Sequence, residues 1–272
     1  MGRIIAVANQ KGGVGKTTTA INLAASLALA DRKVLLVDVD PQANMTSGVG
    51  VRDQVTPDRS IYAPLTAPEI DGDVTPLILQ TAIEGLSIVP ADRNLTGAEI
   101  EMVGLLAREQ RLRRLLHPIA HEFNYIFIDC PPSLGLLTLN ALVAADAVLI
   151  PLHCEYFALE GLAELISTVR RVRSALNPGL DIEGVLLTMV DDRTNLGQQV
   201  SREVRSFFKE KTYNTVIPRN VRLGEAPSHG MPVVLYDVRS RGAEAYLALA
   251  REFLERHAPR LSAAGRDHGA GS

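Results

Sequence analysis

The sequence predicts an α/β fold, with a mostly parallel, twisted central sheet and helices on both of its faces. Short continuous apolar runs, which are typical of buried parallel strands, alternate along the chain with segments of helical periodicity. A chain of 272 residues with 46% apolar content can bury one sizeable core. We therefore expect a single domain over residues 1–257 and a disordered tail over residues 258–272, which are rich in Ala, Gly and Ser.

A glycine-rich loop joins the first predicted strand to the first predicted helix. The apolar run 4–8 precedes the loop, and apolar residues recur at helical spacing from Ala20 to Ala28. Glycines let backbone N–H groups point inward, and the helix N-terminus adds its positive dipole end. This context predicts a P-loop NTPase in which Lys16 reaches the β- and γ-phosphates and Thr17 binds Mg²⁺. The predicted phosphate contacts are Lys11, Gly12, Gly13, Val14, Gly15, Lys16, Thr17 and Thr18.

Two further apolar runs end in aspartates. Residues 34–37 lead to Asp38 and Asp40, and residues 125–128 lead to Asp129. Ligands of parallel sheets bind at the carboxyl ends of the strands, so we expect Asp38 and Asp40 to face the phosphates. Either of these two could instead cap a turn. Asp129 has the position of a carboxylate that holds Mg²⁺, directly or through water.

The remaining segments complete the predicted fold. We expect strands over 86–90, 147–152 and 185–190, and helices over 99–120, 136–144, 157–175 and 242–256. Residues 44–85, which contain several prolines, predict short helical pieces and loops. The arginines of the helix predicted at 99–120 are expected on a solvated face: Arg108, Arg111, Arg113 and Arg114.

Charge is distributed unevenly. The net charge of −3 argues against a uniformly basic nucleic-acid binder, yet residues 193–241 hold nine basic and four acidic residues, a net +5 that leaves −8 for the rest. This asymmetry suggests a basic face, although an ordinary helix surface would explain it equally well. Cys130 and Cys154 form no disulfide framework or metal motif, and no apolar run reaches eighteen residues. With no signal peptide in the sequence, we expect a cytoplasmic protein.

The loop departs from the common pattern G-x-x-x-x-G-K-[ST], because Gln10 replaces its first glycine and Lys11 adds a second lysine. The form K-G-G-x-G-K-[ST] resembles the loop of the MinD/ParA class of ATPases. Four further stretches resemble ParA/Soj chromosome- and plasmid-partitioning ATPases, so that the similarity spans about residues 1–255. These stretches are residues 37–42, 128–132, 154–161 and 217–230.

The resemblance implies that the nucleotide is ATP, in agreement with the absence of an N-K-x-D guanine motif after any late strand. It implies that Lys11 crosses to the nucleotide of a second protomer in an ATP-dependent homodimer, and that Asp40 orients the attacking water. Asp40 is also a candidate Mg²⁺ ligand. By family similarity, the adenine pocket is lined by Met189, Pro218 and Asn220.

The resemblance further implies slow hydrolysis, stimulated by a centromere-binding partner of the ParB/Spo0J type, and nucleoid association through non-specific double-stranded DNA. Since the first strand begins near Arg3, we expect no N-terminal helix-turn-helix and hence phosphate contacts rather than base readout. The arginines expected at DNA are Arg193 and Arg222, with smaller contributions from Arg202, Arg205 and Arg219.

Three other classes share this kind of loop. A MinD-like membrane regulator would carry a C-terminal amphipathic helix, whereas we expect Tyr246, Leu247, Leu249, Phe253 and Leu254 to pack on the domain. An iron–sulfur reductase could bridge a cluster between two chains with Cys130 and Cys154, and a metabolic ligase would need a substrate motif that the sequence lacks.

Overall fold

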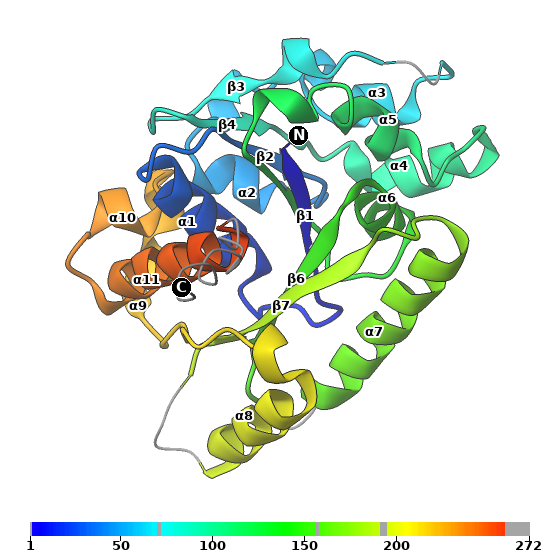
Figure 1. Cartoon of the computed structure of the whole chain (residues 1–272). Helices are drawn as coiled ribbons and strands as arrows, with labels where there is room; N and C mark the ends of the chain where they lie inside the picture. The colour runs from blue at the N-terminus through cyan, green and yellow to red at the C-terminus, as the bar shows by residue number, and fades with distance from the viewer. Residues whose placement is uncertain (1, 70–71, 156–157, 191–194, 259–272) are drawn as a thin grey trace, which may run out of the picture.

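A seven-stranded sheet forms the centre of the molecule (Figure 1). The computed structural model describes residues 2–69, 72–155, 158–190 and 195–258, and its strand order is β3-β4-β2-β5-β1-β6-β7. All pairings are parallel except that of β3 with β4, which confirms the predicted sheet. The strands are β1 (Arg3–Val7), β2 (Val34–Asp38), β3 (Leu79–Gln80), β4 (Leu86–Val89), β5 (Tyr125–Asp129), β6 (Ala147–His153) and β7 (Asp181–Thr188).

Helices cover both faces of the sheet (Figure 1). In β1, Ile5 and Val7 pack in the cluster that holds α1 and α11, whereas Ile4 and Ala6 pack in the cluster that holds α6 and α7. Burial on both faces explains why the strands are continuous apolar runs rather than alternating ones. The helices are α1 (Lys16–Ala28), α2 (Asn44–Gly48), α3 (Tyr62–Thr66), α4 (Leu95–Glu101), α5 (Arg111–Leu116), α6 (Leu136–Ala144), α7 (Ala158–Ala175), α8 (Asn195–Phe208), α9 (Val221–Glu225), α10 (Val233–Tyr236) and α11 (Arg241–His257).

Strand register brings the predicted site residues to one edge of the sheet. Asp129 at the end of β5 is in register with Val7 of β1 on one side and with Asp38 of β2 on the other. The glycine-rich loop follows β1, and Asp40 follows β2. Since all three strands run in parallel, their carboxyl ends and the loops that follow them meet at the same edge.

The prediction of one continuous helix over 99–120 is wrong. Helix α4 ends at Glu101, α5 begins only at Arg111, and Ala107 between them has a left-handed φ of 49°. Both helices bury apolar residues, among them Met102 just beyond α4 and Leu112 in α5. The turn at Ala107 lets the two helices run in different directions, and Met102 and Leu112 both pack in the same core cluster.

The prediction that the arginines of this segment lie on an exposed face is also wrong for Arg111. Arg111 is 2% exposed, and its Nη2 donates to the carbonyl oxygens of Pro64, Ala67 and Glu69. The guanidinium therefore binds the chain on the C-terminal side of α3. A charge pattern cannot reveal this role, because the three acceptors belong to the backbone of a distant segment.

Other differences are smaller. Strand β7 begins at Asp181, four residues before the predicted strand, and the two-residue β3 is additional. Short helices and turns within 44–85 are confirmed. In α11, Tyr246, Leu249 and Phe253 are buried against the body of the domain, as expected. The predicted tail lies outside the described residues after position 258.

Candidate nucleotide and magnesium site

The glycine-rich loop has the backbone of an anion-binding turn. Gly13 and Gly15 have left-handed φ angles of 71° and 87°, which residues with a side chain rarely adopt. Helix α1 begins at Lys16, directly after Gly15, and no side chain caps its first turn. The N–H groups of that turn lack intrahelical acceptors, so they are available to a bound phosphate.

Two polar side chains tie this loop to the sheet. Asn9 donates from Nδ2 to the carbonyl oxygen of Pro151 at 2.7 Å and accepts from the backbone N–H of Lys11 at 3.0 Å. The Thr188 hydroxyl donates to the carbonyl oxygen of Val14 at 2.8 Å. The loop is thus anchored to β6 and β7. Neither Asn9 nor Thr188 was expected at the site, although Asn9 lies just before the glycine-rich motif.

The two loop lysines point to different partners. Lys16 is 6% exposed, and its Nζ donates to the carbonyl oxygen of Lys11 at 3.2 Å. Burial lowers the pKa of Lys16, and the nearby Asp129 and Asp40 charges partly oppose this effect. Lys11 instead forms an ion pair with Glu155, which follows β6. Lys16 is therefore positioned for a phosphate in its own site, whereas Lys11 contacts the rim of the site.

Asp129 is a buried carboxylate without a hydrogen-bond partner. Its exposure is 0%, and neither of its oxygens has a partner among the described residues. Burial, and then the neighbouring Asp38, raise the pKa of Asp129 well above its usual range, while the Thr17 hydroxyl opposes the shift. A buried carboxylate beside a hydroxyl fits a hydrated Mg²⁺, which satisfies such oxygens directly or through water. In the described residues no group of three or more His, Cys, Asp or Glu could hold a metal, so the ion would depend on Thr17 and on phosphate oxygens.

Asp38 and Asp40 have different roles. Asp38 is fully buried and accepts hydrogen bonds from Asp40 N (3.2 Å), Thr46 N (2.8 Å) and the Thr46 hydroxyl (2.7 Å). Asp38 therefore has the turn-holding role that the sequence left open for either aspartate, because these bonds use its oxygens to hold the turn after β2. Among the described residues, the Asp40 carboxylate accepts one hydrogen bond, from Gln42 N at 2.9 Å, and it lies near Lys16. Of the two, Asp40 is the carboxylate available for chemistry.

The residues expected at the adenine lie together beside the loop. Met189, Pro218 and Asn220 line one cavity of about 190 Å³ with Gly15 and Thr18. A parallel bridge between Val190 and Pro218 brings the segment after β7 next to the segment before α9. Asn220 also caps α9 by accepting from Arg222 N.

The predicted DNA-contacting arginines do not form one unpaired patch. Arg222 pairs with Glu225 at 2.7 Å and with Asp237 at 3.3 Å. Arg219 is exposed at the rim of the cavity beside Met189. Arg202 donates to the carbonyl oxygen of Gln198 within α8, and Arg205 donates to those of Tyr213 and Asn214 beyond it. Arg193 lies outside the described residues.

The cysteines do not suggest a cluster site. Cys130 is fully buried, and burial raises the pKa of its thiol. Cys154 is half-buried, and burial raises its pKa to about 11.

Over the described part of the chain, no helix is both long and apolar enough to cross a membrane.

Comparisons with known proteins agree with this site. A family model described as an AAA domain matches residues 2–182. The chain is 58% identical to the sporulation initiation inhibitor protein Soj of Bacillus subtilis, over 93% of this chain and 98% of that protein. It is 56% identical to the chromosome partitioning protein ParA of Myxococcus xanthus, over 96% and 90% of the two chains.

Solved structures show the same architecture. A structure of cobyrinic acid a,c-diamide synthase from Mycobacterium smegmatis with bound ADP and magnesium has a TM-score of 0.80 and 36% identity, and the match covers 94% of this chain and 96% of that one. Sequence identity is higher, over nearly the whole chain, with the partitioning proteins. A phosphate loop, a buried carboxylate beside it and this degree of identity lead to one conclusion: the chain belongs to the Soj/ParA family of chromosome-partitioning ATPases.

Proposed function

We propose that this protein is an ATP-dependent dimerising switch that binds double-stranded DNA non-specifically in its ATP state and segregates a chromosome or plasmid. The proposal covers one ATPase domain over residues 1–257. A ParB/Spo0J-type partner accelerates its slow hydrolysis, and the protein acts in the cytoplasm, on the nucleoid. The observation that carries this proposal is the opposite placement of Lys16, buried inside the loop, and Lys11, held outward by Glu155.

That placement supports a shared nucleotide site. A lysine that served its own phosphates would be expected inside the loop, where only Lys16 lies. Lys11 is at the rim and 37% exposed, so a nucleotide presented by a second protomer could draw it away from Glu155. Two lysines would then neutralise charge on one γ-phosphate in the transition state.

The remaining chemistry depends on positioning. When bound, Mg²⁺ would supply charge neutralisation, with Thr17 and Asp129 holding it and Asp40 as a further candidate. Among the described residues, the Asp40 carboxylate accepts a hydrogen bond from Gln42 N. It can accept a further hydrogen bond from a water beside the γ-phosphate and so orient that water. Met189, Pro218 and Asn220 form a narrow cavity suited to a flat base.

The DNA-binding surface rests on local positive charge. In the free protomer, Arg222 is neutralised by two carboxylates, which weakens its attraction for phosphates. DNA binding should therefore need several cations from two protomers at once. The contributing residues would be Arg193, Arg222, Arg202, Arg205 and Arg219.

The diamide synthase structure raises an alternative activity for this fold. Its identity to this chain is 36%, compared with 58% and 56% for the partitioning relatives. The higher identity, over at least 90% of each relative, favours partitioning.

A DNA-binding assay with ATP, with ADP and without nucleotide tests the proposed function. We expect retention of duplex DNA of unrelated sequences with ATP only, and loss of binding as salt increases. The mass in solution should double under the same ATP condition. DNA binding that is equal in all three states would contradict the proposal.

A further inference from the structure

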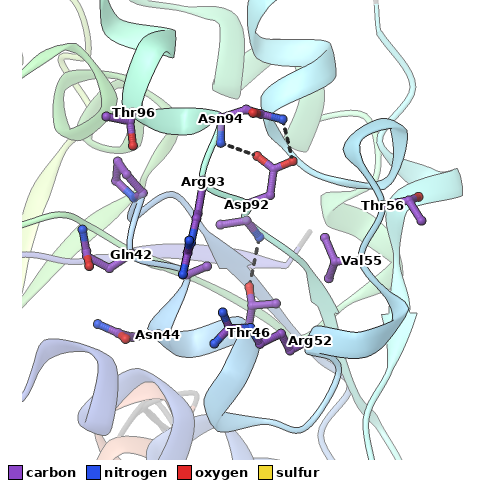
Figure 2. Close-up of a pocket in the computed structure, with 13 residues that line it drawn as sticks. Gln42, Asn44, Thr46, Arg52, Val55, Thr56, Asp92, Arg93, Asn94 and Thr96 are labelled. Atoms are coloured by element: carbon purple, nitrogen blue, oxygen red, sulfur yellow. Dashed lines mark hydrogen bonds between the residues drawn. The ribbon is translucent and has the colours of Figure 1, made fainter.

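A polar cavity of about 780 Å³ opens at the carboxyl edge of β2 and β4 (Figure 2). One wall comes from residues 41–56, which follow Asp40, and the other from residues 91–96, which follow β4. The volume is within the range of about 300–1,000 Å³ found for small-molecule pockets. None of the residues that line it has a part in the proposed nucleotide or DNA site, so its occupant would be a separate ligand.

A hydrogen bond joins the two walls, so the cavity does not depend on a ligand for its shape. The buried Thr46 hydroxyl accepts from Ala91 N of the opposite wall at 3.0 Å and donates to Asp38 at 2.7 Å. Within the second wall, Asp92 accepts from the backbone N–H of Asn94 at 2.9 Å and from its side-chain amide at 3.1 Å. A preformed pocket binds more tightly than a mobile one, because fewer groups lose freedom on binding.

The charged side chains of the cavity favour an anion. Arg52 and Arg93 enter it from different walls, and Figure 2 shows their nitrogen ends toward its middle. Both are exposed, and neither has a hydrogen bond or ion pair with another described residue. Among the described residues of the lining, Asp92 is the one acidic side chain, so two arginines and one aspartate leave a charge of +1. Unpaired guanidinium groups bind phosphates and carboxylates in a bidentate manner.

The neutral side chains favour a phosphate over a carboxylate. Gln42, Asn44 and Thr96 are exposed at the cavity, and they provide amide and hydroxyl donors in addition to the two guanidinium groups. A phosphate ester has three terminal oxygens and about two negative charges at neutral pH, whereas a carboxylate has fewer acceptor oxygens and less charge. The phosphate therefore matches a lining with this many donors better.

The shape of the cavity favours a small organic molecule over a macromolecule. The convex backbone of a duplex would not enter a concave pocket. Val55 and Ala91 add apolar surface between the polar groups, which suits the carbon skeleton of an organic phosphate better than inorganic phosphate alone. The amide oxygens of Gln42 and Asn44 can accept hydrogen bonds from hydroxyl groups on such a skeleton.

We propose that this cavity is a binding site for a small organic phosphate of the sugar-phosphate class. Arg52 and Arg93 hold the phosphate group, and the amides of Gln42 and Asn44 bind hydroxyl groups of the organic part. This site goes beyond the proposed function and does not rest on it, because the two sites share no residue.

Calorimetric titration of the full chain with ribose 5-phosphate tests the site, at saturating ADP and Mg²⁺ so that the phosphate loop is filled. We expect one binding event per chain with a Kd of about 1 mM or tighter. The affinity should fall about tenfold or more in the Arg52→Ala/Arg93→Ala variant, because charge-assisted hydrogen bonds are lost. The Arg59→Ala/Arg173→Ala variant removes the same charge from exposed positions outside the cavity, and it should bind within about twofold of wild type.

Further probes identify the class of ligand. Ribose, which lacks the phosphate, and succinate, a dicarboxylate, should bind about tenfold or more weakly than ribose 5-phosphate. Inorganic phosphate should bind about threefold or more weakly, since it lacks the organic part. Thermal unfolding gives a second readout: ribose 5-phosphate should raise the unfolding midpoint more in wild type and in the control variant than in the Arg52→Ala/Arg93→Ala variant.

Several results would overturn the proposal. Unchanged affinity in the Arg52→Ala/Arg93→Ala variant, or an equal loss in the control variant, would show that the two arginines form no specific site. Succinate that binds as tightly as ribose 5-phosphate would make the cavity a carboxylate site. Competition between ribose 5-phosphate and ADP would place the ligand in the phosphate loop, and displacement by duplex DNA or by a polyglutamate peptide would assign the cavity to a macromolecule. Absence of saturable binding up to about 10 mM would leave no site for this class of ligand.

Discussion

At the residue scale, chemically identical side chains in this site have different roles because their surroundings differ. Asp38 uses its oxygens in three hydrogen bonds within the turn, whereas Asp40 accepts one and lies near Lys16. Lys16 is buried in the loop and Lys11 is paired at the rim. Free donors and acceptors, rather than residue type, determine which of each pair can act on a phosphate.

Replacement of Asp40 should separate binding from hydrolysis. Asp40→Ala should still bind ATP and Mg²⁺ but hydrolyse about 100-fold or more slowly, because water orientation is lost while the phosphate contacts remain. Light scattering should show a persistent dimer, and phosphate release measures the rate. The exposed Asp53→Ala is the control. A monomeric Asp40→Ala protein in ATP, or normal turnover, would contradict the assignment.

The two lysines should respond differently to substitution. Lys16→Ala should weaken ATP binding by the monomer about tenfold or more, since it removes a charge-assisted contact to phosphate. Lys11→Ala should keep monomer affinity within about threefold and abolish dimerisation, because its partner in the free protomer is Glu155. Isothermal titration and light scattering measure both. Equal loss of affinity in the two variants would show that Lys11 acts on its own nucleotide.

At the element scale, long-range contacts decide where short helices begin and end. The segment 99–120 has helical composition, yet α4 ends at Glu101 and α5 begins only at Arg111, and both helices bury apolar residues in the core. Arg111, at the start of α5, binds one carbonyl oxygen of α3 and two of the chain just beyond it. Helix α5 and the segment around α3 are thus joined by this one side chain as well as by apolar packing.

Arg111 should matter for stability rather than for nucleotide binding. Arg111→Ala should lower the free energy of unfolding by about 2–4 kcal/mol, because buried carbonyls lose a charged donor. Arg113→Ala, in the same helix and without such contacts, should change it by less than about 0.5 kcal/mol. Urea denaturation measures both variants. Similar losses in the two would mean that the Arg111 hydrogen bonds contribute little.

At the scale of the whole molecule, one buried carboxylate joins the N-terminus, the last strand and the last helix. Glu183 of β7 accepts from Tyr213 at 2.9 Å and pairs with Arg3 at 2.8 Å and His257 at 3.3 Å. Burial opposes ionisation of Glu183, but the hydrogen bond and charge of His257, together with Arg3, outweigh it and lower the pKa. This cluster lies at the edge of the sheet opposite the nucleotide site.

The lowered pKa predicts how stability depends on pH. A carboxyl group with a lower pKa in the folded state contributes stability above its ordinary pKa near 4.5 and loses it as pH falls. Glu183→Gln should therefore cost about 2–3 kcal/mol at pH 7 and less at pH 4. Denaturant unfolding at both values measures this, with the exposed Glu84→Gln as control. A cost that is independent of pH would mean that packing, not charge, is lost.

DNA binding also belongs to the whole molecule, since it should need two protomers. Arg222→Glu should weaken ATP-dependent DNA binding about tenfold or more and reduce its salt dependence, because each dimer loses two phosphate contacts. Dimerisation should persist, since the ion pairs of Arg222 are with Glu225 and Asp237 of its own chain. Arg59→Glu is the charge-matched control. Wild-type DNA affinity in Arg222→Glu would place the basic surface elsewhere.

The sequence by itself determined the sheet, the phosphate loop, the carboxylate Asp129 at the end of a buried strand and the family. These features depend on local spacing: a run of apolar residues specifies a strand buried on both faces, and glycines at 13 and 15 specify a left-handed turn. Only the tertiary structure decided which aspartate is free, that Lys11 pairs with Glu155, that Arg111 is buried, and that Thr188 holds the loop at Val14. The lysine ion pair, the buried arginine and the loop contact of Thr188 depend on partners far away in the sequence, and Asp38 depends on the fold of the turn that returns Thr46 to it. Side-chain spacing along one segment carries no information about such partners.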